Sequence, residues 1–235
     1  MIILRNKNFA LLEKKQYYKN NWDRLKHGWF GTSKESIDRH NNYVSNYNAR
    51  QKKLSDLLKN DPRQYLTYLY DLDIVTKRLR EFEKVFNTKL PQDIFKYVET
   101  IKSFAGPLKT WAARYPDEVN EKPEILRSAG IINYFNMNFE DNDGRVEDIE
   151  DTEDIRMIDI DYDDEVVYNI KDKVWRLGNV GDSSKSKTLK GIILPSIKAM
   201  IGYDEEYTRN NDDVDKHLPE FELRKLWYNH VKSKL

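Results

Sequence analysis

The sequence predicts a mainly α-helical fold of the α+β type, in which an N-terminal helical bundle carries a small antiparallel β insertion and a C-terminal helix. Apolar residues recur at intervals of three and four over most of residues 1–135, which indicates helices with one buried face. Strict alternation near residues 158–162 is typical of a strand. We therefore expect a helical body (1–135), an acidic loop with a β-meander (136–190), and a C-terminal segment (191–235) that packs on the body or on a neighbour.

Capping residues and glycines delimit the first two predicted helices. Residues 8–26 hold a loose apolar stripe, and the glycine-containing stretch 27–31 interrupts it. Thr32 and Glu35 have the spacing of a capping box, in which each side chain bonds the other residue's backbone N–H. This pattern predicts a second helix that ends near Asn60.

The third and fourth helices have the clearest patterns. Asp61 suits an N-cap and Pro62 suits the first helical position, so a new helix begins there. Pro91 opens the fourth helix, and three later prolines divide the chain that follows into short helices. The residues expected to face the core are Tyr65, Leu69, Leu72, Val75, Leu79, Phe82 and Phe86 in the third helix and Ile94, Phe95, Val98 and Ile101 in the fourth.

The β region is predicted to follow a polar, acidic loop over residues 136–154. Ile158, Ile160 and Tyr162 alternate with Asp159 and Asp161, which predicts a strand with one apolar and one acidic face. Two further strands are expected to complete an antiparallel meander. The ranges expected to follow are strands at 166–170 and 173–177, a Gly/Ser/Lys loop at 178–190, a short helix or buried irregular chain at 191–203, and a helix opened by Pro219.

Charge is distributed very unevenly along the chain. Its 40 basic and 40 acidic residues give a net charge of zero. Residues 140–165 nevertheless hold fourteen acids and two bases, a net charge of −12, whereas residues 1–60 hold thirteen bases and five acids. Such segregation favours docking onto charged neighbours, including copies of the same chain.

Composition points to a soluble chain that is made inside the cell. There is no cysteine, so disulfides, thiol nucleophiles and cysteine metal sites are excluded. The first residues lack the apolar run of a signal peptide, and no stretch approaches the length of a membrane span. The hydrophobic share of 39% is low, and fifteen Tyr, nine Phe and five Trp supply much of the apolar material.

Two segments partly match phosphate- and calcium-binding motifs. Residues 181–188 resemble a P-loop, but Ser186 replaces the second glycine, whose missing side chain lets the backbone wrap phosphate. A basic loop that contacts an acidic partner or nucleic-acid phosphate is the simpler interpretation. Residues 139–150 partly match an EF-hand, yet Phe139 occupies the first ligand position and cannot bind a cation.

Acidic and histidine side chains offer no complete catalytic site. The aspartates near residue 160 are able to hold Mg²⁺ or Mn²⁺, but the solvent face of a strand is the favoured interpretation, because no further residue at an informative spacing completes a site. None of His27, His40, His217 and His230 lies in a zinc or serine-hydrolase motif, and His230 is expected to be half-exposed. We therefore expect no catalytic residue, no metal ligand, no cofactor and no enzymatic activity.

The basic N-terminal region alternates cations with aromatic residues. Bases stack on aromatic rings and phosphates attract lysine, so this region also suits single-stranded nucleic acid. An amphipathic helix with a basic outer face remains the other interpretation. The residues concerned run from Arg5 to Lys26.

The N-terminus resembles that of virion proteins of crAss-like phages. Residues 2–9, Ile-Ile-Leu-Arg-Asn-Lys-Asn-Phe, and residues 14–18, Lys-Lys-Gln-Tyr-Tyr, carry this resemblance, which covers about eighteen residues. The Asn-, Asp-, Lys- and Tyr-rich composition without cysteine is similar to that of such podovirus-type proteins. The resemblance implies a structural component of the virion, made in the cytoplasm of a host bacterium, and it carries no catalytic residues.

Together these patterns predict a head-to-tail ring or connector subunit that assembles through complementary charged surfaces. The expected partners are copies of itself and neighbouring portal or tail proteins, with nucleic acid possible and no membrane. A nucleic-acid-binding or packaged cargo protein is one alternative, and a divalent-metal-dependent phosphoryl-transfer enzyme is another. The predicted contacts are acidic (Asp159, Asp161, Asp163, Asp164), basic (Lys14, Lys15, Lys19, Arg24) and C-terminal (Phe221, Trp227, Tyr228).

Overall fold

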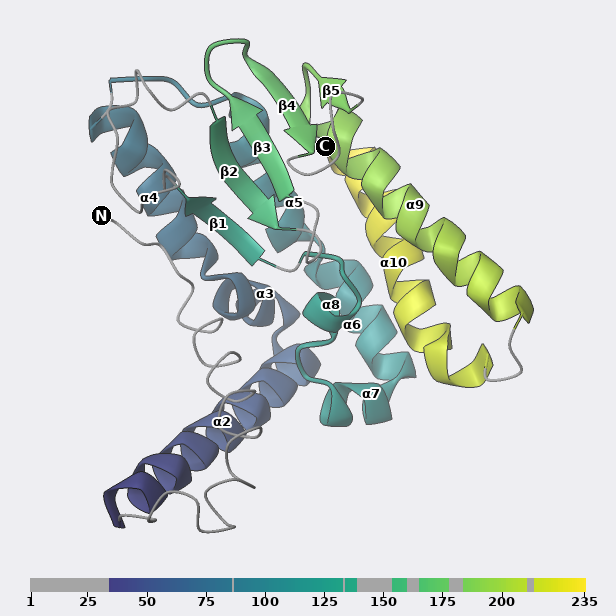
Figure 1. The fold of residues 1–235 in the computed structure, drawn as a ribbon. Helices are drawn as coiled ribbons and strands as arrows, with labels where there is room; N and C mark the ends of the chain where they lie inside the picture. The colour runs from purple at the N-terminus through teal and green to yellow at the C-terminus, as the bar shows by residue number, and fades with distance from the viewer. Residues whose placement is uncertain are drawn as a thin grey trace, which may run out of the picture.

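The protein is mainly α-helical with one small antiparallel sheet, which confirms the predicted fold class. The computed structural model describes residues 34–85, 87–132, 134–138, 154–159, 165–177, 184–210 and 214–235. Seven helices precede the sheet in these residues, and a long helical hairpin follows it (Figure 1). The predicted helix at 8–26 and the capping residue Thr32 lie outside the described residues.

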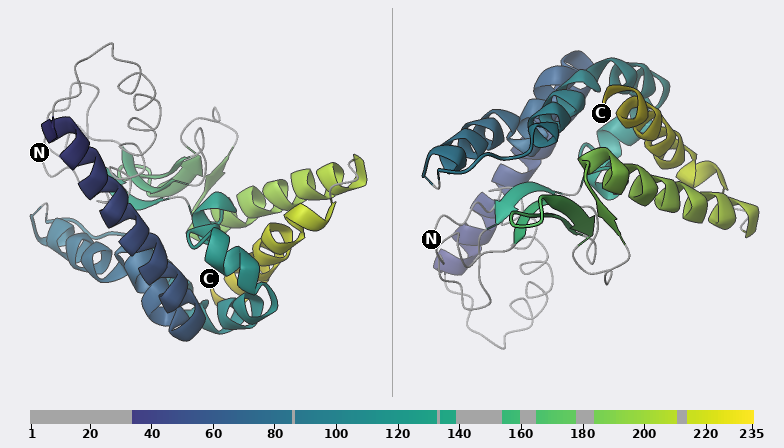
Figure 2. Two further views of the ribbon diagram at one scale, coloured as in Figure 1. Left: turned by 90° about the horizontal axis from the view of Figure 1, so that it is seen from below. Right: turned by 90° about the horizontal axis from the view of Figure 1, so that it is seen from above.

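Helix α2 (Lys34–Asn60) is the longest element, and its N-terminal half extends away from the other described elements (Figures 1 and 2). Its C-terminal half packs into the core through Leu54 and Leu58, which are completely buried. The apolar stripe continues into the projecting half, where Ile37 and Val44 are 36% and 38% exposed. The sequence therefore supplies more apolar helix face than the described body covers.

The predicted third helix is two helices, α3 (Pro62–Tyr70) and α4 (Leu72–Val85). The start of α3 is as expected, because the Asp61 side chain accepts a hydrogen bond from the backbone N–H of Gln64 at 3.0 Å. Asp71 interrupts the predicted helix with φ of 49°, a left-handed conformation that ends α3. Aspartate tolerates this conformation better than most residues do, so the turn forms without glycine.

Helices α5 (Gln92–Ser103), α6 (Ala105–Arg114), α7 (Pro116–Glu121) and α8 (Ile125–Ser128) complete the body. Pro91 stands at the N-cap of α5, and Pro116 opens α7, in line with the prediction. Three of the four residues expected inside the fourth helix are buried: Ile94, Val98 and Ile101. Phe95 is only half-buried.

The sheet has the strand order β1-β2-β3-β4-β5, and every pair is antiparallel. It is therefore the expected meander, with an additional strand at each edge. The bounds are β1 (Tyr134–Asn138), β2 (Asp154–Asp159), β3 (Glu165–Asn169), β4 (Val174–Leu177) and β5 (Lys185–Ser186). The expectation of a helix and loop around β1 was wrong.

Strand β2 carries a bulge directly before the predicted alternation. Arg156 pairs with Val167 and Ile158 pairs with Val166, so Met157 is an extra residue at a bulge. Met157 and Ile158 are consequently both buried, at 1% and 2% exposure. The strand begins at Asp154, before the predicted start at Ile158, and residues 160–164 lie outside the described part of the chain, so the alternation past Asp159 stays a prediction.

The C-terminal segment forms an antiparallel hairpin of α9 (Leu189–Asn210) and α10 (Val214–Lys234). Both are longer than predicted. Pro219, which was expected to open the last helix, lies inside α10, and Pro195 lies inside α9. The indole Nε1 of Trp111 donates a hydrogen bond to the Pro219 carbonyl at 2.8 Å. Helix α10 thereby returns to the body, one of the two arrangements expected from the sequence.

One hydrophobic core joins the helical body, the sheet and the hairpin. It extends from Leu54 in α2 through Trp175 in β4 to Val231 in α10. Strand β1 contacts α4, whereas β4 and β5 contact α9, so the sheet spans the distance between body and hairpin (Figure 1). The three predicted segments therefore share a single buried interior.

Candidate docking surface

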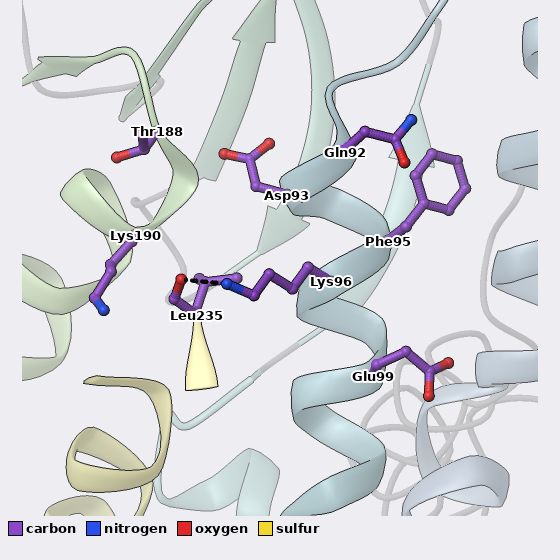
Figure 3. A pocket seen from close by; sticks show the side chains of 8 residues that line it. All are labelled: Gln92, Asp93, Phe95, Lys96, Glu99, Thr188, Lys190 and Leu235. Atoms are coloured by element: carbon purple, nitrogen blue, oxygen red, sulfur yellow. Dashed lines mark hydrogen bonds between the residues drawn. The ribbon is translucent and has the colours of Figure 1, made fainter. Parts of the chain in front are cut away.

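Five lysines gather where the start of α9, the end of α10 and α5 meet. Two of them, Lys96 and Lys190, line an open pocket of about 550 Å³ together with Asp93, Thr188 and Leu235 (Figure 3). The other three are neighbours of these lining residues along the chain. We call Lys96, Lys187, Lys190, Lys232 and Lys234 the lysine surface.

Local interactions fix the start of α9 beside α5 and β5. The Asp93 carboxylate of α5 accepts a hydrogen bond from the Leu189 backbone N–H at 2.6 Å, which satisfies one of the free donors at the α9 N-terminus. Gly191 lies so close to Ser186 of β5 that an added Cβ would overlap the serine hydroxyl. A glycine is therefore required for this close approach.

The end of α10 is held by two members of the lysine surface. Lys190 Nζ donates a hydrogen bond to the Lys232 carbonyl at 2.8 Å, and Lys96 Nζ donates to the Leu235 carbonyl at 3.0 Å. These are carbonyls that a helix C-terminus leaves without partners, and positive charge also complements its dipole. The two lysines thus have a structural role in addition to their charge.

The lysine surface nevertheless carries more positive charge than its surroundings balance. In the described residues no ion pair involves any of its five members. The acids that line the pocket are Asp93, which caps α9, and Glu99, which pairs with Lys102 at 3.4 Å. The α10 C-terminus contributes about half a negative charge. A surplus of positive charge remains, and it is available to an external partner.

Aromatic rings beside the lysine surface are already covered. Phe95 and Tyr228 pack against the core on one side. The Arg80 guanidinium lies 3.8 Å from the Phe95 ring centroid, and Lys232 Nζ lies 5.9 Å from that of Tyr228. The Phe95 ring therefore has no free face for stacking a nucleic-acid base, whereas Tyr228 is only half-buried. The surface is therefore suited to carboxylates more than to single-stranded nucleic acid.

The residues predicted as charged contacts lie mostly outside the described residues. Asp161, Asp163, Asp164, Lys14, Lys15, Lys19 and Arg24 are in this group. Asp159 is described as the last residue of β2, where it pairs with Tyr134 on one side and Glu165 on the other. The prediction for these residues stays a prediction.

The predicted C-terminal contacts divide into one core residue and two surface residues. Trp227 is 1% exposed and its ring lies 5.0 Å from that of Phe104, edge to face. It packs inside its own chain, so its assignment as a contact with a neighbour was wrong in this conformation. Phe221 and Tyr228 are half-buried, and each ring has a lysine of its own helix nearby.

His230 is buried and not half-exposed as the sequence suggested. It is 8% exposed, and its Nε2 lies 2.9 Å from the Thr100 carbonyl and 3.0 Å from the Ser103 hydroxyl. Burial lowers the pKa of His230, and the positive charge of Lys234 lowers it further, while the hydrogen bond to Thr100 raises it. The imidazole is therefore a neutral structural group that links α10 to α5.

A buried ionic cluster joins α2, α3 and α8. The Glu124 carboxylate lies 3.4 Å from Arg50 Nη2 and 3.1 Å from Arg127 Nη1, and it accepts a hydrogen bond from Gln51 at 2.9 Å. Arg127 also donates to the Leu69 carbonyl. Burial lowers the pKa of Arg50, and Glu124 opposes this effect. We interpret the cluster as a structural joint between three helices.

The partial motifs provide no complete site in the described residues. Lys185 and Ser186 form β5, and the Ser186 hydroxyl accepts a hydrogen bond from the Thr188 N–H at 3.1 Å. Residues 181–183 and the EF-hand-like stretch 139–150 lie outside the described residues. Within the described ranges, no three acidic or histidine side chains come together in a way that suits a metal ion. None of the described helices has the length and apolarity needed to cross a membrane.

The sequence pointed to part of the lysine surface and missed the rest. The loop at 178–190 was expected to be basic and able to contact an acidic partner, whereas Lys96, Lys232 and Lys234 were not proposed. One usable signal was the absence of any acid after Glu222 in the terminal helix. The proximity of the three segments is a property of the tertiary structure alone.

Comparisons with protein-family models, curated proteins and solved structures find no match to this chain.

Proposed function

We propose that this protein is a structural subunit that assembles through complementary charged surfaces. One observation carries the proposal. The lysine surface has a surplus of positive charge without an ion-pair partner in the described part of the chain, and the same sequence contains a segment of net charge −12 at residues 140–165. Opposite charges on one molecule favour contacts between copies.

The N-terminal resemblance to crAss-like phage virion proteins suggests where such a subunit acts. On this basis we propose a head-to-tail ring or connector component that contacts copies of itself and neighbouring portal or tail proteins. The mainly helical body with a small sheet and two projecting elements, α2 and the α9–α10 hairpin, is compatible with this role (Figure 2). Projections of this kind allow one subunit to reach the next.

The mass of the purified protein as a function of salt tests the proposal. We expect an oligomer at about 0.05 M NaCl that dissociates toward 1 M, because the screening length falls to about 3 Å at that ionic strength. Light scattering coupled to size exclusion measures the mass directly. A protein that stays monomeric at low salt, alone and with its virion neighbours, would contradict the proposal.

A second candidate, nucleic-acid binding, is favoured by the lysine surface alone. Retention on single-stranded DNA at about 0.15 M salt, with loss near 0.5 M, would support it, because phosphate contacts release counterions. The covered face of Phe95 favours the first candidate.

A further inference from the structure

We propose that the lysine surface of one copy receives the acidic segment of a neighbouring copy, through those carboxylates of residues 140–165 that lie outside strands β2 and β3. This inference rests on the proposed function and names the two surfaces that meet. It replaces the basic N-terminal residues, which the sequence suggested as the positive partner, with a surface whose structure is described.

Charge complementarity identifies the occupant. The acidic segment has a net charge of −12, and the lysine surface is a cluster of five cations with a surplus of positive charge. All five cations are lysines, whose compact ammonium groups on flexible stems suit a run of carboxylates without requiring one fixed geometry. The bidentate geometry of arginine, which favours phosphate recognition, is absent from this set.

The shape of the site also suits a polypeptide segment. An open pocket of about 550 Å³ lies between α5 and the start of α9, and Lys96 and Lys190 border it (Figure 3). Two further members, Lys232 and Lys234, are exposed at the adjoining end of α10. A chain with carboxylates at several successive positions can contact pocket and rim together.

The contact between copies is heterologous, because different surfaces of the two subunits meet. Such contacts close into a ring when the rotation between subunits permits it. Each subunit then donates one acidic segment and offers one lysine surface. This arrangement explains how a chain of zero net charge carries two strongly charged regions.

Charge reversal tests the inference with two complementary variants. The lysine variant combines Lys187→Glu, Lys232→Glu and Lys234→Glu, and it leaves Lys96 and Lys190 to hold the end of α10. The acid variant combines substitutions of three aspartates to lysine, Asp161→Lys, Asp163→Lys and Asp164→Lys. The control variant carries the same charge change on exposed lysines of α2, α4 and α6, as Lys52→Glu, Lys84→Glu and Lys109→Glu.

Each variant alone should associate about 100-fold more weakly than the original protein, because three attractive contacts become repulsive. The control should associate within a few-fold of the original protein. A mixture of the two variants should recover the original mass, since the reversed lysine surface of one then meets the reversed acidic segment of the other. Circular dichroism and urea unfolding verify that every variant is folded.

The outcomes separate this inference from the proposed function. If the wild-type protein never assembles, both the proposed function and this inference are wrong. Salt-sensitive assembly that neither variant weakens overturns only the pairing of these surfaces. A third outcome is that mixing the two variants does not restore assembly, whereas one chain with all six substitutions does assemble. This result indicates docking within a single chain and also overturns the inference. Loss of DNA retention in the lysine variant, without an assembly defect, assigns the surface to nucleic acid instead.

Discussion

Removing the Glu124 carboxylate should destabilise the protein strongly, because this one carboxylate neutralises two buried guanidinium groups. Arg50 and Arg127 are each 7% exposed, and Glu124 lies within 3.4 Å of both. In a Glu124→Ala variant, the two arginines would keep their charge, lose the carboxylate that they share and repel each other. Each would also be too deeply buried to be solvated fully by water.

The expected magnitude follows from this burial. Removing one partner of a buried ion pair typically costs about 3–5 kcal/mol, whereas an exposed pair contributes at most about 1 kcal/mol. For a protein of this size, 1 kcal/mol corresponds to roughly 2–4 °C in Tm, so the variant should melt about 6–20 °C lower. Urea unfolding followed by circular dichroism measures the free energy of unfolding directly.

Two further variants make the test specific. Glu121→Ala removes an exposed acid of α7 and should change stability by less than about 0.5 kcal/mol. A triple variant with Arg50→Met, Glu124→Leu and Arg127→Met should recover most of the stability lost in Glu124→Ala, because no charge is left without a partner. A loss below about 1 kcal/mol in Glu124→Ala would refute the view that this cluster is desolvated.

Two other predictions concern the C-terminal hairpin. Because the pKa of His230 is lowered in the folded state, the unfolded chain binds a proton more readily, so stability should be full above pH 6.5 and decline below it. Urea unfolding at about pH 7.5 and 5.5 should show this decline, and His230→Gln should reduce its slope; an unchanged slope would contradict a neutral buried imidazole. Gly191→Ala should cost about 1–3 kcal/mol, because the new Cβ lies 2.9 Å from the Ser186 Cβ and overlaps its hydroxyl. Gly106→Ala, which meets nothing within 4 Å, should be neutral or slightly stabilising in the same thermal melt, and equal effects of the two substitutions would argue against the close approach.

Helix boundaries were predictable where a residue determines them locally. Asp61 and Pro62 mark the start of α3 because one side chain bonds a free N–H and the other needs no partner. Asp71 gave no such signal, since the apolar spacing continues across it and aspartate adopts a left-handed conformation only in suitable surroundings.

The sheet was predictable in type but not in register. Alternation indicated a meander, and the antiparallel order confirms it. The bulge at Met157, which makes Met157 and Ile158 both buried, was not predicted, because pairing with β3 and burial against the core decide where an extra residue is accommodated. Strand β1 was missed although Phe135, Asn136, Met137 and Asn138 alternate between apolar and polar, and β2 provides hydrogen-bonding partners for it.

The sequence by itself determined the helical class, the existence of a small antiparallel sheet and the separation of charge along the chain. These properties depend on neighbours a few residues apart, whose spacing sets which face of an element is apolar or charged. Only the tertiary structure decided that Trp227 faces its own core and that Lys96, Lys190 and Lys232 share one surface. Contacts between distant segments depend on how the whole chain closes around its core, and local spacing carries no record of that closure.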